Sequence, residues 1–146
     1  MKSDVSIRLA QPSDCTQLAR LREALWPGSS VDERARGLAL LPLIDLVAEA
    51  TDGKLVGFLE VGLRSHADGC DCTHLIGFIE GWYVAEDRRR QGIGRKLLLA
   101  AEDWARRQGC REMASDTPIE NEISQRVHQA LGYMVVDRCV HYRKPL

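Results

Sequence analysis

Residues 75–109 read LIGFIEGWYVAEDRRRQGIGRKLLLAAEDWARRQG, in which an apolar run, a basic loop with two glycines and an amphipathic run follow one another directly. The first eleven residues are apolar except for one glutamate, which predicts a buried strand. In the last fifteen, Leu97, Leu98, Ala101 and Trp104 recur at the spacing of one helix face. The segment therefore predicts a strand, a turn and a helix that packs on the sheet.

The turn of this unit, RRRQGIG at 88–94, is chemically unusual for the start of a helix. The amino end of a helix carries partial positive charge, so each cation placed there costs about 0.3–1 kcal/mol. No Ser, Thr, Asp or Asn stands in position to cap the helix. Glycines expose backbone N–H groups, so a phosphate-bearing ligand would supply both the missing cap and the missing negative charge. The alternative is a solvated basic turn whose arginines pair with Glu86 and Asp87.

Known nucleotide loops do not fit this turn. It lacks the Gly-Lys-Ser/Thr ending of a Walker loop and the third glycine of the dinucleotide fingerprint. The anion is therefore expected to belong to another class of phosphate-bearing ligand.

On both sides of this segment, the chain alternates between strand and helix patterns. An Asp-Gly step at 52–53 predicts a hairpin, and Ser13 or Asp14 is positioned to cap the first helix. Strands are predicted over 5–10, 44–50, 54–64, 75–85, 111–117 and 133–144, and helices over 12–26, 30–41, 95–109 and 120–131. Hairpins come first and strand–helix–strand units later, which predicts an α+β (mixed α/β) fold with helices packed on one sheet.

Composition sets the broad class. With 146 residues the chain is expected to form one domain, and 45% hydrophobic and 28% charged residues are typical of a globular protein. A net charge of −1 argues against a surface built to coat nucleic acid or an anionic membrane. No apolar run reaches the roughly 20 residues of a membrane span, and the N-terminus lacks the apolar core of a signal peptide.

The cysteines favour a reducing compartment. Five is an odd number and their spacing is not that of a small disulfide scaffold, so we expect reduced thiols in the cytoplasm. Two of them fall in the loop 65–74 together with His66 and His74. The spacing Cys70-x-Cys72 is tight for a tetrahedral site, so no metal is expected there.

The pattern Arg89-x-x-Gly92-x-Gly94, after a strand and opening a helix, resembles the acetyl-coenzyme A loop of the GNAT superfamily of N-acetyltransferases. The resemblance covers nearly the whole chain, from IRLAQPSD (7–14) to the stretch 121–133 ending in ALGY. It implies a central mixed, mostly antiparallel sheet with a V-shaped splay at the acetyl-CoA site. It also implies that the coenzyme is bound by Trp82, Tyr83, Val84, Arg89, Arg90, Gln91, Gly92, Ile93, Gly94, Arg95 and Asn121.

Longer segments narrow the resemblance. LREALWPG, GCD, IEGWYV, CREMASDT and ISQRVHQALGY together resemble the aminoglycoside 6'-N-acetyltransferases. This implies acetyl transfer to the 6'-amino group of an aminoglycoside, antibiotic resistance and a homodimer. The implied substrate positions are Trp26, Glu80, Asp116 and Asp137. His66 lies near the place of a subfamily aromatic residue, in a loop that is one residue shorter here.

The residue types agree with a polycationic substrate. Such a substrate needs carboxylates for its ammonium groups and an aromatic face for its sugars. Glu80 interrupts an apolar run, so it either faces a cleft or pairs with an arginine. Asp116 ends a strand, but it could equally cap the following helix. Asp137 has an outward-facing alternative, and Trp26 has a core alternative.

The chemistry requires a proton acceptor. An alkyl ammonium has a pKa of about 10.4, so a base must deprotonate it before it attacks the thioester directly in a ternary complex. Asp116 is favoured over Glu80 and over water. A main-chain N–H of Tyr83–Val84 would meet the oxyanion. His128 stands where many GNAT members place a tyrosine, and it is either the acid for the thiolate or a structural histidine.

Two rival functions remain open at this point. The first is the same chemistry on another amine, such as a polyamine or a peptide N-terminus. The second is a non-enzymatic sensor that binds acyl-coenzyme A. The collection of acidic residues favours an enzyme that binds cations over a sensor.

Overall fold

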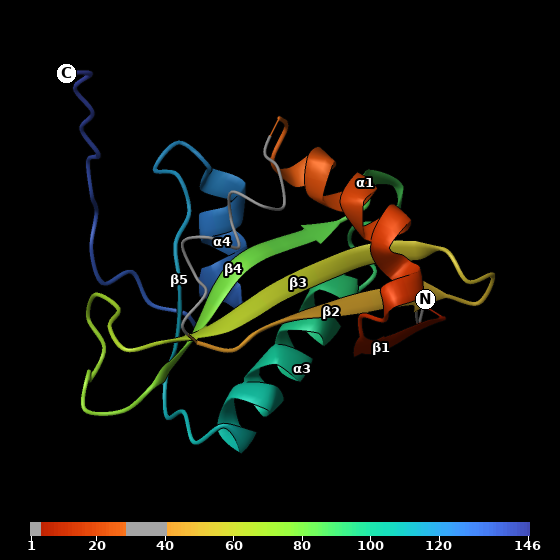
Figure 1. Cartoon of the computed structure of the whole chain (residues 1–146), viewed down its shortest axis with the longest axis horizontal. Coiled ribbons are helices and arrows are strands. Elements are labelled where there is room, and N and C mark those ends of the chain that lie inside the picture. The colour runs from red at the N-terminus through yellow and green to blue at the C-terminus, as the bar shows by residue number, and fades with distance from the viewer. Residues whose placement is uncertain (1–3, 29–40) are drawn as a thin grey trace.

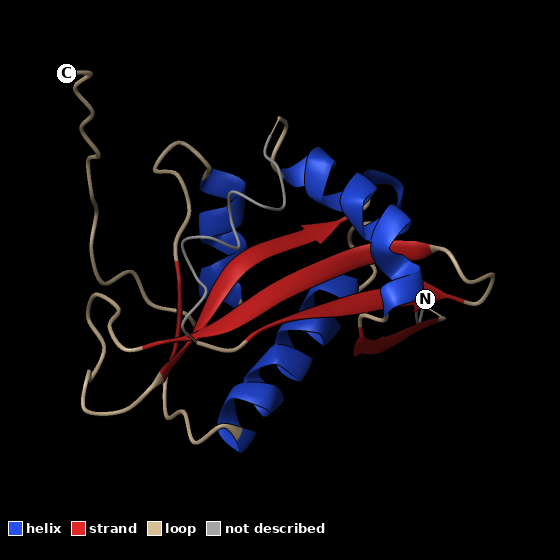
Figure 2. Cartoon of the chain, in the orientation of Figure 1, coloured by secondary structure: helices blue, strands red, loops and turns tan. Residues whose placement is uncertain are grey.

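The computed structural model describes residues 4–28 and 41–146. Its strands and helices, with two short 3-10 turns, follow one another around a single twisted sheet (Figure 1; Figure 2). In chain order they are β1 (Val5–Leu9), η1 (Pro12–Asp14), α1 (Cys15–Leu25), β2 (Leu43–Ala50), β3 (Leu55–Arg64), β4 (Ile76–Val84), η2 (Glu86–Arg88), α3 (Ile93–Arg107), β5 (Met113–Ser115) and α4 (Glu122–Ala130).

The sheet keeps the order of the sequence, β1-β2-β3-β4-β5. Neighbouring strands from β1 to β4 are antiparallel, and β5 alone runs parallel to β4. The parallel step is possible because α3 provides the crossover between β4 and β5. The mixed, mostly antiparallel sheet of an α+β fold is thereby confirmed. So is the hairpin at Asp52-Gly53, where Gly53 takes a φ of +84°.

Helices cover both faces of the sheet. One face packs against α3, whose buried side is formed by Ile93, Leu97, Leu98, Ala101, Trp104 and Ala105. The other face packs against α1 through Leu18 and Leu21, which meet Val47, Leu55 and Phe58. Each fully buried Leu or Phe side chain contributes about 1.5–3 kcal/mol to stability. Figure 1 shows α1 in front of the sheet and α3 behind it.

Strands β4 and β5 stay together only briefly. Their register runs from Gly77↔Met113 to Ile79↔Ser115, whereas β4 continues to Val84. The pairing with β3 also shifts here, because Glu60 and Val61 are opposite Gly81 and Ile79, which leaves Glu80 as an extra, bulged residue of β4. The two strands therefore part beyond Ile79 and Ser115, which confirms the V-shaped splay (Figure 1).

Two expectations differ from the structure, and a third falls on residues that it does not describe. The predicted helix 30–41 falls outside the described residues except for Leu41. The strand or strand pair predicted over 133–144 is not formed: Tyr133 is half-buried, and from Met134 the segment is an exposed tail that runs away from the sheet (Figure 1). A strand needs a neighbour for its backbone N–H and C=O groups, and none of the described strands pairs with the tail.

Asp14 is the second difference, because its side chain does not cap α1. It is buried, and its carboxylate accepts hydrogen bonds from the Gln11 backbone N–H and from both terminal nitrogens of Arg8. The Arg8 guanidinium lowers the pKa of Asp14 to about 2. Asp14 therefore ties the start of the first helical segment to β1.

Candidate functional site

The glycine loop has the geometry of an anion site. Gly92 is the N-cap of α3 with a φ of +80°, no side chain donates or accepts a capping bond there, and the first turn holds no acidic residue. Arg90 has a φ of +62°. The first N–H groups of a helix have no intrahelical partner, so those of α3 face outward together with the helix dipole.

The arginines of the loop form no ion pairs with the two acidic residues that precede them, Glu86 and Asp87. Within 4–28 and 41–146, no ion pair joins Arg88, Arg89 or Arg90 to Glu86 or Asp87. Arg89 instead donates from Nε to the Val84 carbonyl oxygen at 2.9 Å and lies 5.4 Å from the Tyr83 ring centre. The loop therefore folds back on the end of β4 and leaves its positive charge uncompensated by these acids.

On the α3 side of the splay, a serine and a histidine meet. The Oγ of Ser115 lies 2.8 Å from His128 Nε2, and His128 Nδ1 lies 2.7 Å from the Ser124 carbonyl oxygen. The imidazole packs edge-on against Trp82 of β4 and against Tyr133, with ring centres 5.5 and 5.8 Å apart. Burial raises the pKa of Tyr133, so its phenol stays neutral.

Asn121, the predicted coenzyme contact in this region, has a local role as well. Its side-chain oxygen accepts a hydrogen bond from the Ser124 backbone N–H at 3.1 Å, which makes it the N-cap of α4. The cap accounts for the residue type without a ligand.

The α1 face of the splay carries Glu80. Both of its carboxylate oxygens accept hydrogen bonds of 2.8 Å from the guanidinium of Arg64, which lies 3.5 Å from the ring centre of Phe78. Its side chain is 8% exposed. The arginine-paired alternative is thus the state of Glu80 in the structure, and a substrate ammonium would meet a carboxylate that is already held in place.

Two further carboxylates on this face were missed from the sequence. Asp45 of β2 is directly opposite Glu60 of β3, and Glu60 is opposite Gly81, the neighbour of Glu80. Arg22 of α1 donates to both Asp45 and Glu60. Glu60 interrupts the apolar run LVGFLEVGL, which is the same signal that singled out Glu80.

Trp26 and Asp116 complete the region. The indole of Trp26 is half-buried against Gly81, with its ring 5.9 Å from that of Phe58, so it belongs partly to the core. Asp116 is exposed and directly follows Ser115. Since Ile79↔Ser115 is the last pair of β4 and β5, Glu80 and Asp116 are the first residues beyond it on each strand.

The structure does not bring His66 or Asp137 to this group. His66 lies in the 65–75 loop with its Nδ1 3.0 Å from Cys72 Sγ. Asp137 is exposed in the tail and accepts a hydrogen bond only from the next backbone N–H, among the bonds of the described residues. The tail crosses the loop at Gly69, where an added Cβ would lie 2.7 Å from Val136 Cβ.

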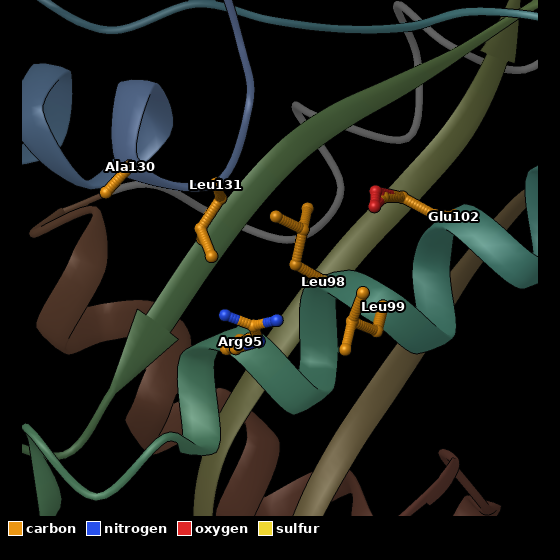
Figure 3. A pocket seen from close by; sticks show the side chains of 6 residues that line it. All are labelled: Arg95, Leu98, Leu99, Glu102, Ala130 and Leu131. Carbon is orange, nitrogen blue, oxygen red and sulfur yellow. The ribbon is translucent and has the colours of Figure 1, made fainter.

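A small cavity opens beside the glycine loop, between α3 and α4 (Figure 3). Its volume is about 120 Å³, and its lining consists of Arg95, Leu98, Leu99, Glu102, Ala130 and Leu131. Ligand pockets usually measure about 300–1,000 Å³. This hollow is therefore too small for a whole coenzyme or oligosaccharide, and it lies apart from the carboxylates. The candidate site is therefore placed at the splay of β4 and β5, between the glycine loop and the carboxylates, and not at this cavity.

No three or more His, Cys, Asp or Glu side chains in the described ranges are arranged to hold a metal ion. In the same ranges, no helix has the length and apolar character that crossing a membrane requires. All five cysteines are described, and all are free thiols.

Comparison with known proteins places this geometry in a family. The model of the acetyltransferase (GNAT) family matches residues 15–133. An aminoglycoside N(6')-acetyltransferase type 1 of Klebsiella aerogenes is 38% identical over 153 residues, which cover 100% of both chains. One of Serratia marcescens is 45% identical over 131 residues, covering 86% of this chain and 89% of the relative.

Solved structures agree. The aminoglycoside acetyltransferase AAC(6')-Iy, in complex with a bisubstrate analogue made of CoA and acetylneamine, superposes with a TM-score of 0.86 at 36% identity, covering 99% of this chain and 100% of that one. AAC(6')-Ih from Acinetobacter baumannii gives a TM-score of 0.83 at 30% identity, with coverages of 97% and 99%.

Proposed function

The chain belongs to the acetyltransferase (GNAT) family, and from that premise we propose that it transfers the acetyl group of acetyl-CoA to the 6'-amino group of aminoglycosides and so confers resistance to them. The observation that carries the proposal is the splay of β4 and β5, which has an uncapped, basic glycine loop on one side and a row of carboxylates with Trp26 on the other.

The coenzyme would enter from the α3 side. The N–H groups from Arg90 to Arg95 would hold its pyrophosphate, because an anion there completes the helix end and meets unpaired arginines. Its pantetheine arm would follow the edge of β4 from Val84 to Trp82, beside which no described strand pairs on the β5 side beyond Ile79. The coenzyme is a co-substrate in this scheme.

The aminoglycoside would enter from the α1 side. Glu80 and Asp116 flank the opening on its two strands, and the Trp26 indole provides a flat face beside them. Asp116 is exposed and has no arginine partner among the described ion pairs, whereas Glu80 is held by Arg64. Asp116 is therefore the better proton acceptor, and Glu80 the better anchor for a second ammonium group.

The transfer itself would be direct. The neutral amine attacks the thioester carbonyl, a main-chain N–H near Tyr83–Val84 meets the oxyanion, and the carbon–sulfur bond then breaks. Attack from the α1 side and departure of the thiolate on the α3 side follow from the positions of the two half-sites.

A homodimer in the cytoplasm completes the proposal. The tail beyond Tyr133 exposes Met134, Val136, Val140 and Tyr142, and among the described strands β5 is paired only with β4. An alternating tail and an open strand edge are complementary features that a second copy could satisfy. The five free thiols suit a reducing compartment.

Thiol release from acetyl-CoA tests the function. Neomycin and paromomycin make a matched pair, because they differ in carrying an amine or a hydroxyl at position 6'. We expect release with neomycin and kanamycin but none with paromomycin, spermidine or a peptide. Turnover of spermidine or the peptide alone would identify another amine substrate. Coenzyme binding without any turnover would identify a sensor.

A further inference from the structure

The hydroxyl of Ser115 and the imidazole of His128 form a hydrogen-bonded pair at the mouth of the splay. Ser115 is the last paired residue of β5, and its Oγ is 2.8 Å from His128 Nε2. Both residues are half-buried, so they line the wall of the opening rather than the closed core. A hydroxyl and an imidazole at this position can form hydrogen bonds with a ligand bound between β4 and β5.

The orientation of the imidazole is fixed. Its Nδ1 faces the Ser124 carbonyl oxygen at 2.7 Å, and a carbonyl only accepts, so Nδ1 carries a hydrogen. The proton that His128 gains or loses is therefore the one on Nε2, which faces Ser115. Trp82 and Tyr133 hold the ring edge-on from two sides.

The pair lies on the α3 side of the splay, which is the side that the proposed mechanism gives to the leaving group. Trp82, which contacts His128, packs with the α3 core, whereas Trp26 packs with the α1 core. The carboxylates that would bind the amine share the α1 face with Trp26. Ser115 and His128 are therefore on the coenzyme's side of the thioester, away from the attacking amine.

We propose that Ser115 and His128 deliver a proton to the departing coenzyme A sulfur, an inference that rests on the proposed acetyl transfer. As the nitrogen–carbon bond forms, the carbon–sulfur bond breaks and its electron pair goes to sulfur. The Ser115 hydroxyl proton moves to sulfur, and the Nε2 proton of the imidazolium replaces it on Oγ. Water restores the imidazolium after the products leave. Ser115 touches the reacting sulfur, and His128 acts through it as a positioning and proton-supplying residue.

Two substitutions of equal shape isolate the hydroxyl. Ser115→Thr keeps it, whereas Ser115→Val replaces it by a methyl group, and both β-branched residues suit a strand. With acetyl-CoA and neomycin, we expect Ser115→Val to lower kcat about 10²-fold, the low end of a general-acid contribution. Ser115→Thr should keep most of kcat. The Kd of acetyl-CoA, measured by calorimetry, should be the same in both variants.

His128→Gln tests the second member. A glutamine amide N–H is able to hydrogen-bond Ser115 but does not release a proton, so kcat should fall by a similar factor. Because the pair acts as a unit, the combination with Ser115→Val should be no slower than either single variant. Melting temperatures of all variants show whether any loss comes from unfolding.

Three kinetic results would contradict the proposed proton delivery. Equal kcat for Ser115→Val and the wild type, or equal losses for Val and Thr, would overturn the proton-delivery role. Additive losses in the double variant would also overturn it. A wild type that does not acetylate neomycin contradicts the proposed function itself, so the two failures are distinguishable.

Discussion

The indole of Trp26 lies so close to Gly81 that a single methyl group on residue 81 would overlap the six-membered ring. Gly81 is the residue after Glu80 in β4, and it is opposite Glu60. The aromatic face of the candidate substrate site therefore exists because the neighbouring strand position has no side chain.

Gly81→Ala should displace the Trp26 indole and weaken aminoglycoside binding. Loss of the ring contact is worth about 1–2 kcal/mol, so we expect the KM for neomycin to rise about 10-fold. Gly62→Ala is the matched control, because its methyl group meets Leu43 Cδ1 at 2.9 Å on the same face without touching the indole. Equal KM values for the two variants would show that Trp26 is only a core residue.

Gly92→Ala should weaken acetyl-CoA binding through the backbone. A side chain at a φ of +80° costs about 1–2 kcal/mol, which distorts the helix end where the phosphates would bind. Gly109 lies just beyond the other end of α3 with a φ of +89°, and neither glycine has an atom within 4 Å of an added Cβ.

The two alanine variants should therefore lose similar stability, while only Gly92→Ala loses coenzyme affinity. The increase in melting temperature caused by millimolar acetyl-CoA measures this difference. Gly94→Glu should abolish the increase, because it adds a negative charge to the loop that would bind phosphates and places its Cβ 3.3 Å from Trp82 Nε1. An undiminished increase in Gly92→Ala would place the coenzyme elsewhere.

Asp116→Ala should lower kcat/KM for neomycin about 10²-fold, the usual size of a general-base contribution. The Kd of acetyl-CoA should barely change, because the glycine loop is a separate element. If Asp116 is the base, activity should partly recover at high pH, where the amine is already neutral; if it only anchors an ammonium group, it should not. Asp103→Ala, in an exposed ion pair of α3, is the control. Asn121, not Asp116, caps α4, so a wild-type kcat/KM in Asp116→Ala would leave Asp116 without a role in the reaction and make Glu80 the leading candidate.

The ion pair of Arg64 and Glu80 should be strongly coupled. In a double-mutant cycle of Arg64→Met and Glu80→Gln, we expect an interaction free energy of about 1–3 kcal/mol in urea unfolding. Arg64→Met alone should be the most destabilised, because it leaves the Glu80 carboxylate buried without this partner. If Glu80 also anchors substrate, Glu80→Gln should raise the KM for neomycin in both backgrounds. An unchanged KM would restrict Glu80 to a structural role.

Stability should fall in acid through Asp14. Its pKa is about 2 in the folded chain and about 3.9 when unfolded, so the ionised form stabilises the fold by about 2 kcal/mol. Because the folded pKa is the lower one, this stabilisation is complete above about pH 4 and is lost as pH falls through about 2. Urea midpoints of Asp14→Asn and the wild type should differ at pH 7 and converge towards pH 3. Asp103→Asn, whose side chain is 62% exposed, should show no such trend.

Regular patterns made most of the fold predictable. Leu97, Leu98, Ala101 and Trp104 form the buried face of α3 as their spacing indicated, and the Asp-Gly turn joins β2 to β3. Boundaries were less certain, because strand ends depend on neighbours: the strand expected over 111–117 is only Met113–Ser115, where β5 leaves β4. The tail alternates like a strand, but alternation does not supply a pairing partner.

The site was only partly predictable for a similar reason. Glu80, Asp116 and Trp26 could be named individually, yet the sequence does not show that Arg64 holds Glu80 or that Ser115 meets His128. These contacts join residues 16 and 13 positions apart in different elements. The link between Asp45 and Glu60 was not predictable either, because their shared partner, Arg22, lies in α1, 23 and 38 positions away in the sequence.

The strict order β1-β2-β3-β4-β5 also has a consequence for synthesis. Strands β1 to β4 pair with sequence neighbours, and α3 follows them at once, so a growing chain can close this part of the sheet while its last elements are still unmade. Ser115, Asp116 and His128 all come later, with β5 and α4. We expect a ribosome-bound chain stalled before β5 to resist proteases over its first strands and yet to have no acetyl-transfer activity.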